Sequence, residues 1–371
     1  MATIHSLPPE TILRILQLIH APTEHHLHDI RSFTEALSPL HRACLVCREW
    51  ARFGQPLLWK VLSIVSDGCV RRVLDSPALG RFRTQRLNVV LYQSQQWGTG
   101  CWSKDISRVL EGLRGVQTMV LDGARWAVDG TGEWIASANL KGAELKSLSL
   151  NTAFERFDFL TTPSVTPSVS FQLSSLSLGP FFNFPLFTRS IIASSSHTLT
   201  SLSLNVHHTC TSLPVLLSAF KLLKHTLQSL EITGEILGLQ VYLPSFTALK
   251  SLKIINEKLR DFSYPFIDSL LRALPASVTS TKIYCQLQPG TKDVHLSNLA
   301  ERIVAGEFGW ERLTELELED YFEESLGKEY FVRWRALAEI CRRLGVQHSG
   351  ELEILDFGED SGDEWISAVV E

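Results

Sequence analysis

Three histidines near the amino terminus are the first side chains in this sequence that could do chemistry. His25, His26 and His28 carry imidazole nitrogens of the kind that bind zinc and other transition metals. No cysteine or carboxylate completes a recognisable ligand spacing with them. We therefore expect the three histidines to lie in a solvated loop or an extra helical turn, and we predict no metal site.

Cys44 and Cys47 form a Cys-x-x-Cys sequence, which is a spacing found in redox pairs. Such a pair is expected beside a βαβ unit, whereas these two cysteines lie in a segment with the apolar pattern of a helix. They are predicted to be packing thiols inside that helix. The seven cysteines of the chain are odd in number and scattered, which argues against a disulfide framework and favours a reducing compartment.

Sequence motifs of enzymes are not found. The stretches Gly98–Gly100 and Gly130–Gly132 are too short for a phosphate-binding loop, and neither lies between a convincing strand and a helix. Nucleophile-elbow, zinc-protease and Walker-type sequences are also missing. We predict no catalytic residue, no cofactor and no enzymatic activity. An enzyme built on a repeat scaffold is a rival hypothesis, which a deep polar pocket holding titratable groups would favour.

Composition and charge exclude several classes of protein. The chain has 371 residues, 44% of them hydrophobic, which is enough for a large core or for two domains. It lacks a secretory signal and any apolar run long enough to cross a bilayer, so we expect no membrane contact and a cytoplasmic or nuclear location. The net charge is -5, with 17 acidic and 6 basic residues from Glu311 onward. Because no basic stripe stands out, we predict no nucleic-acid partner.

Short helices are expected in the first sixty or so residues. Apolar residues from Ile12 to Ile19 recur at helical spacing behind Pro8 and Pro9, and proline is tolerated in a helix's first turn. A second helix is predicted from about Leu40 to Phe53, where Gly54 and Pro56 would end it. A unit this small buries little surface alone, so it must dock against something larger.

The stretches Leu7–Glu10, Leu45–Trp50 and Leu57–Trp59, in this order, resemble an F-box. In that family the helices pack against a Skp-type adaptor, which joins the protein to a cullin-based ubiquitin ligase. The resemblance covers about residues 4–62 and departs from the family in a long inserted loop at about residues 20–39. It implies that the unit's small core and the adaptor share the apolar residues Leu7, Pro8, Ile12, Ile15, Leu16, Leu45, Val46, Trp50 and Trp59.

The rest of the chain repeats the pattern apolar-x-x-apolar-x-apolar. Each copy predicts a short strand with one apolar face, and the amphipathic segments between copies predict helices. The array is similar to the irregular leucine-rich repeats of fungal-type F-box proteins. This resemblance implies an α/β solenoid over residues 63–357, with parallel strands on the concave side, helices outside, and an acidic tail at 358–371. The copies begin at Val116, Leu145, Leu173, Leu199, Leu227, Leu249, Val278, Leu313 and Leu352, with weaker ones at Trp59 and Thr84.

Function on such a solenoid is expected on strand residues that point away from the leucines, toward the concave side. We predict a target-binding surface formed by Ser177, Ser203, Glu231, Lys253, Lys282, Tyr284, Glu315 and Glu317. The chain would then be the substrate-recognition subunit of a ligase of the SCF type, with an adaptor, a cullin and a protein target as partners. The alternative is a leucine-rich-repeat scaffold that does not assemble into a ligase.

Overall fold

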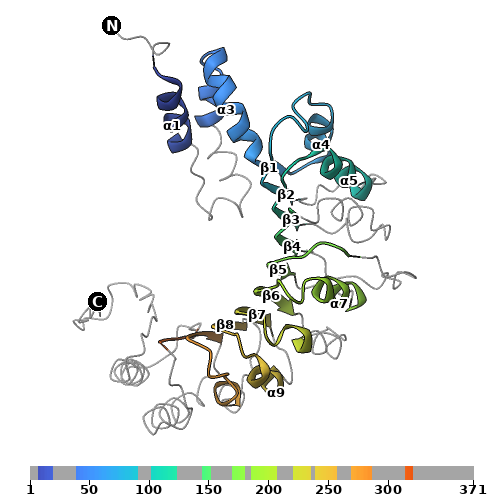
Figure 1. Ribbon diagram of the computed structural model, residues 1–371, viewed down its shortest axis with the longest axis vertical. Helices are drawn as coiled ribbons and strands as arrows, with labels where there is room; N and C mark the ends of the chain where they lie inside the picture. Colours follow the sequence, from blue (N-terminus) through green and yellow to red (C-terminus); the bar gives the residue numbers. More distant parts are fainter. Residues whose placement is uncertain are drawn as a thin grey trace, which may run out of the picture.

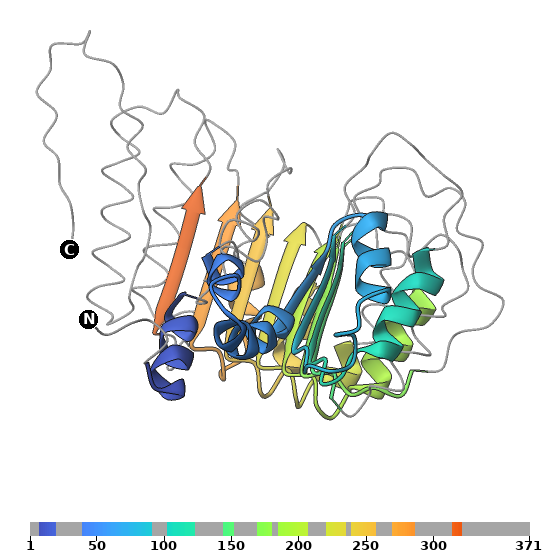
Figure 2. The same ribbon diagram turned by 90° about the horizontal axis from the view of Figure 1, so that it is seen from above.

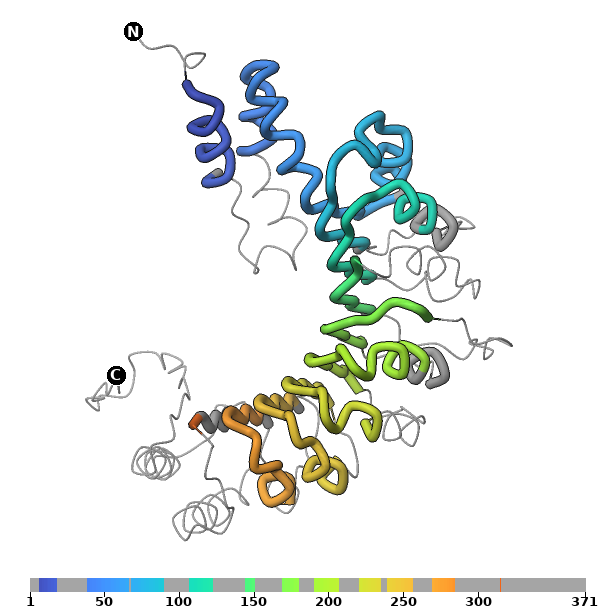
Figure 3. The backbone as a smooth tube through the Cα atoms, in the orientation of Figure 1, coloured from blue at the N-terminus to red at the C-terminus, as the bar shows by residue number. Residues whose placement is uncertain are grey.

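The computed structural model describes residues 7–19, 39–90, 102–122, 144–151, 169–179, 185–206, 220–234, 239–256, 269–285 and 314–320. Within these residues the chain forms a helical unit at the amino terminus, followed by a long parallel sheet (Figure 1). Figure 3 draws the same backbone as a tube, in which the chain passes from strand to strand along a curved sheet. The fold is therefore mixed α/β, as the sequence predicts.

The helical unit contains α1 (Pro9–Ile19), a short helix at 39–44 and α3 (Arg48–Lys60). Pro9 occupies the first position of α1, where a missing N–H costs nothing. The three helices bury a small core of their own, which is separate from the core of the sheet. Its buried apolar members are Ile12, Leu16, Leu40, Ala43 and Trp50.

The predicted helix from Leu40 to Phe53 is wrong in its boundaries. The chain turns at Leu45 and Val46, whose N–H groups donate to the carbonyls three residues earlier, and Cys47 is extended. The next helix, α3, then runs through Gly54 and Pro56, where the sequence predicts a break. An internal proline costs a helix about 3 kcal/mol. Because α3 packs apolar side chains on its core-facing side, tertiary burial outweighs that local preference.

In the described residues the sheet has ten strands, and every neighbouring pair is parallel and in sequence order. All strands therefore point the same way, as Figure 2 shows. The helix α3 passes into the first strand with no linker, so the predicted domain boundary between residues 62 and 63 falls within that strand. The strands are β1 (Val61–Ile64), β2 (Arg86–Val90), β3 (Thr118–Asp122), β4 (Ser147–Asn151), β5 (Ser175–Leu178), β6 (Ser201–Val206), β7 (Ser229–Gly234), β8 (Ser251–Asn256), β9 (Ser280–Cys285) and β10 (Glu315–Asp320).

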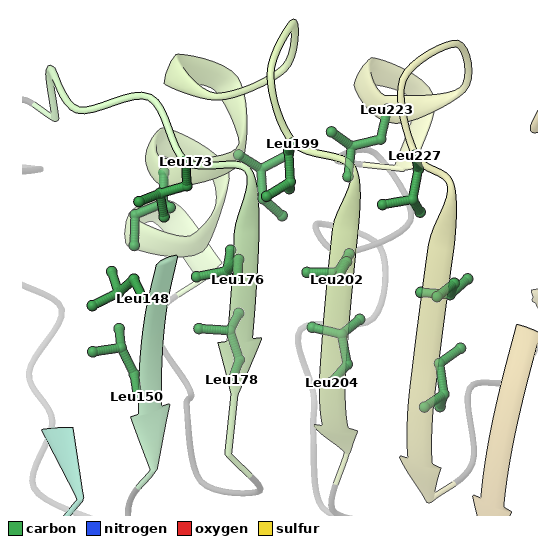
Figure 4. Close-up of a cluster of buried hydrophobic side chains, with 14 of the residues drawn as sticks. Leu148, Leu150, Leu173, Leu176, Leu178, Leu199, Leu202, Leu204, Leu223 and Leu227 are labelled. Atoms are coloured by element: carbon green, nitrogen blue, oxygen red, sulfur yellow. The ribbon is translucent and has the colours of Figure 1, made fainter. Parts of the chain in front are cut away.

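The register of the sheet follows the repeated pattern of the sequence. The second apolar position of each copy pairs with the second position of the next, for example Leu148 with Leu176 and Leu176 with Leu202. These leucines point to the same side of the sheet and form one continuous core (Figure 4). The ten strands correspond to the predicted copies that begin at Trp59 through Leu313, which confirms the repeat. The copy at Leu352 lies outside the described residues.

The described helices outside the helical unit lie on one face of the sheet. The strands lie along an arc, and α4 (Asp67–Leu74), α5 (Trp102–Gly112), α7 (Pro185–Ser194) and α9 (Leu239–Tyr242) lie on its outer side (Figure 1). A short 3-10 helix, η3 (Leu243–Ser245), follows α9. This arrangement is consistent with a solenoid whose strands line the concave side. None of the described helices is long and apolar enough to cross a membrane.

Candidate protein-binding surfaces

The residues of the helical unit that the resemblance assigns to the adaptor interface fall into three groups. Ile12, Leu16 and Trp50 are buried in the small core, and Leu7 and Ile15 are half-buried against it. The buried members are therefore held by the unit itself. Ile12 and Leu16 have no exposed surface, and Trp50 is 8% exposed, so these side chains contribute mainly to the core of the unit.

A second group points outward. Leu45 is 73% exposed and Val46 is 51% exposed, because both lie in the turn between the short helix and α3. Pro8 is exposed just before α1. Leu18, which sequence reasoning did not assign to a site, is 67% exposed near the end of α1. Among the described residues five large apolar side chains are exposed, and three of them belong to this unit, so the unit offers apolar surface to a partner.

Trp59 forms the third group alone. It lies at the carboxyl end of α3, is half-buried, and packs against the core of the sheet. Leu57 and Leu58, its neighbours on α3, pack against the small core instead. The end of α3 thus packs on both cores, and Trp59 is its contact with the core of the sheet.

The two cysteines of the Cys-x-x-Cys sequence do not share a helix, which corrects the prediction made for them. Cys44 ends the short helix, whereas Cys47 stands before the first residue of α3. Both are free and half-buried, and burial raises the pKa of the Cys44 thiol. Cys44 contacts Gly54 across the helix pair, so its role in the described structure is packing.

The amino-terminal unit also matches a known protein family. Residues 4–65 match the F-box-like family model. The matched region contains α1, the short helix at 39–44, α3 and β1, so it covers the helical unit together with its junction to the sheet. No curated protein is similar enough to the whole sequence to count as a relative. The F-box-like unit is thus supported by its sequence family as well as by its helices.

The concave side of the sheet carries the residues predicted to bind a target. Six of the eight occupy one row across neighbouring strands, because each is paired in register with the next. Tyr284 lies in a different row, between Ile255 and Glu319, and Glu315 pairs with Ser280. The row from β5 to β10 reads Ser177, Ser203, Glu231, Lys253, Lys282 and Glu317.

An ion pair lies in the middle of this row. Lys253 Nζ is 3.0 Å from Glu231 Oε1, and both side chains are little more than one-third exposed. Opposite charges directly across neighbouring strands stabilise a sheet modestly. The pair therefore holds two long side chains next to the short serines Ser177 and Ser203 of the same row. A parallel row of six serines crosses β4 to β9, formed by Ser147, Ser175, Ser201, Ser229, Ser251 and Ser280.

A polar cluster that sequence reasoning missed lies at the β1 end of the same row. Asn88 is buried, accepts a hydrogen bond from Arg86 Nε at 2.9 Å, and donates one to Ser63 Oγ at 3.2 Å. Asn88 lies between Leu87 and Val89, which are the second and third apolar positions of the weak repeat copy at Thr84. That copy was the sequence signal that could have placed Asn88 on the concave side. The bond to Ser63 ties β2 to β1 beside the F-box-like unit, and the bond from Arg86 orients the Asn88 side chain within β2.

The described part of the chain can be compared with the requirements of a metal site. Within it, no three histidine, cysteine, aspartate or glutamate side chains gather as a metal site would require. His25, His26 and His28 lie outside the described residues, as does the acidic tail at 358–371.

One carboxyl group on the concave side is perturbed, since burial raises the pKa of Asp122.

Proposed function

We propose that this chain is the substrate-recognition subunit of a cullin-type ubiquitin ligase of the SCF class. The F-box-like unit binds a Skp-type adaptor, and the sheet, as an irregular leucine-rich-repeat solenoid, binds the target protein. The observation that carries the proposal is the match of residues 4–65 to the F-box-like family, on a unit that exposes apolar side chains at Leu18, Leu45 and Val46.

The junction between the two parts supports this division of labour. The helix α3 contributes to the small core and continues directly into β1, while Trp59 packs on the sheet core. A rigid junction holds a bound target at a fixed position relative to the adaptor. The chain would therefore contribute proximity to ubiquitin transfer, and the catalytic cysteine would belong to another subunit in the cytoplasm or nucleus.

The concave row supports target binding by the solenoid. Its serines are short, so the backbone of a partner can approach the sheet closely, and the Glu231–Lys253 pair offers charge to orient that partner. We propose Ser177, Ser203, Glu231, Lys253 and Lys282 as the centre of this surface. Tyr284, Glu315 and Glu317 extend it toward β10.

The test is co-expression with a Skp-type adaptor, followed by size-exclusion chromatography. The full chain is expected to form a stable one-to-one complex. The double variant Leu45→Asp with Val46→Asp should lose it, since charges in an apolar interface are costly to bury. Val241→Asp is the matched control, because Val241 is also 73% exposed and lies on α9, away from the F-box-like unit.

A chain that lacks the F-box-like unit provides a second test of adaptor binding. The truncation should end at Lys60, because a cut after residue 62 would remove half of β1. Loss of the complex on truncation supports the proposal. A full chain that stays soluble and unbound beside the adaptor would contradict it and favour the non-catalytic scaffold.

A further inference from the structure

Two arginines lie side by side at the edge where the first strands of the sheet begin. Arg83 and Arg114 are 31 positions apart in the sequence, yet they are partners in a parallel bridge just before β2 and β3. The N–H of Thr84 donates to the carbonyl of Arg114 at 2.8 Å, which locks the two loops together. Both arginine side chains are exposed. The fold therefore brings two exposed arginines into register with each other at the surface.

The side chain of Arg83 is positioned by its surroundings. Its Cγ, Cδ and Nε atoms lie directly against Gly115, on the spot that a Cβ would occupy, and Gly115 has a φ of 77° that favours glycine. Arg81, two residues earlier, has its guanidinium carbon 5.4 Å from the centre of the Phe82 ring, within the range of a cation–π contact. Two of the three arginines thus lose part of their freedom before any ligand arrives.

Three arginines, Arg81, Arg83 and Arg114, form what we call the arginine group, and each is exposed. Within the described part of the chain, no carboxylate pairs with any of the three. Like charges placed opposite each other on neighbouring strands destabilise a sheet. An anionic ligand would relieve that repulsion, and a planar guanidinium forms paired hydrogen bonds with a carboxylate better than an ammonium does.

We propose that the arginine group binds an acidic segment of another protein. Side chains two residues apart on an extended segment lie on one side, about 6.8 Å from each other, a spacing that two neighbouring arginines can reach together. Nucleic acid fits less well, because binding at physiological salt draws on roughly six to ten phosphate contacts and this site offers three cations on a chain of net charge -5. None of the three arginines belongs to the concave row or to residues 4–65 of the F-box-like unit.

The proposal can be tested on the full chain by fluorescence anisotropy with a labelled polyglutamate peptide. Wild-type protein should bind it, and more weakly as salt rises. The double variant Arg83→Glu with Arg114→Glu should lose at least about tenfold in affinity. Lysine at both positions should lose less. The control is Lys221→Glu with Lys224→Glu, two exposed lysines in another repeat with the same change in net charge, and its loss should stay under about twofold.

Three results would overturn the proposal. The first is the absence of peptide binding by wild-type protein. The second is an equal loss of affinity in the arginine-to-glutamate variant and in the control Lys221→Glu with Lys224→Glu, which would indicate a general attraction to positive charge. The third is tighter binding of a phosphoserine peptide or a single-stranded RNA through the same arginines, which would assign the site to phosphate. None of these results bears on adaptor binding, so failure here is distinguishable from failure of the ligase role.

Discussion

Gly54 marks the tightest contact between two helices of the F-box-like unit. A Cβ at this position would overlap the Sγ atom of Cys44. We expect Gly54→Ala to lower the free energy of unfolding of the unit by about 1–3 kcal/mol, as overpacking does in other cores. Urea denaturation of the chain, followed by circular dichroism and adaptor binding, measures the loss.

Two matched variants isolate the cause of that loss. Gly68 in α4 has room, since the nearest heavy atom to an added Cβ is Ser66 Oγ at 3.8 Å, so Gly68→Ala should be neutral or slightly stabilising. Cys44→Ala removes the obstructing sulfur and should restore much of the stability of the Gly54→Ala variant. If Gly54→Ala lowers stability equally in the wild-type and in the Cys44→Ala protein, steric overlap with the Cys44 sulfur is not the cause.

Asp122 should make the stability of the sheet depend on pH. It ends β3 on the concave side, and burial raises the pKa of its carboxyl group above that in the unfolded chain, about 3.9. Between the two pKa values the folded state binds more protons than the unfolded state, so stability falls as pH rises through this window. Above it, the cost of burying the charge persists.

Asp122→Asn removes this titration. We expect the variant to be more stable than wild type at neutral pH, with the difference shrinking as pH falls toward about 4. Urea denaturation of both proteins at a series of pH values gives the difference, in which the other titrating groups cancel. A variant that is less stable at neutral pH would mean that the ionised carboxylate of Asp122 has a favourable partner.

At the scale of elements, α3 joins the two parts of the molecule through Trp59. We expect Trp59→Ala to destabilise the protein by about 2 kcal/mol, less than the loss of a fully buried tryptophan, because the side chain is half-buried. Adaptor affinity should stay within about threefold of wild type, since Trp59 packs on the sheet core. Thermal unfolding and adaptor titration of the same variant separate the two effects, and Trp59→Phe is the conservative control. A large loss of adaptor affinity without a loss of stability would show that Trp59 contacts the adaptor, as the resemblance to F-box proteins implies.

The strands were predictable from sequence, whereas the helix boundaries of the F-box-like unit were not. The same positions are buried in every repeat, and a slip of one residue between strands would expose a leucine such as Leu202. The apolar pattern of the sequence therefore also specifies how neighbouring strands pair. Around Leu45 the apolar pattern continues across the turn. No local signal marks the break, and packing carries α3 past Pro56.

The candidate sites differ in the same way. Alternation along strands identified the concave residues, and register then placed Ser177, Ser203 and Glu231 in one row. In the F-box-like unit the sequence shows which helix positions are apolar. It does not show which of these side chains the unit itself buries, so Ile12 and Leu45 received the same prediction. The contact of Arg83 with Arg114 is created by the fold and has no counterpart in the local sequence.

At the scale of the whole molecule, the described residues form two hydrophobic cores with no buried residue in common. One core belongs to the F-box-like unit, and the other runs along the sheet, where each strand pairs only with its neighbours. In such an array stability is close to a sum of repeat and interface contributions. A local loss should therefore stay local, and the two parts should not unfold in a single two-state transition.

Leucine truncations in the two cores test this independence. Leu16 is fully buried in the small core, and Leu202 is 1% exposed in the sheet core, so each Leu→Ala change should cost its own part about 2–5 kcal/mol. In hydrogen exchange followed by mass spectrometry, Leu16→Ala should speed exchange in α1 and α3 and leave β6 and β7 unchanged, whereas Leu202→Ala should do the reverse. If Leu16→Ala speeds exchange in β6 as much as in α1, the two cores unfold together, and α3 transmits stability from one end of the chain to the other.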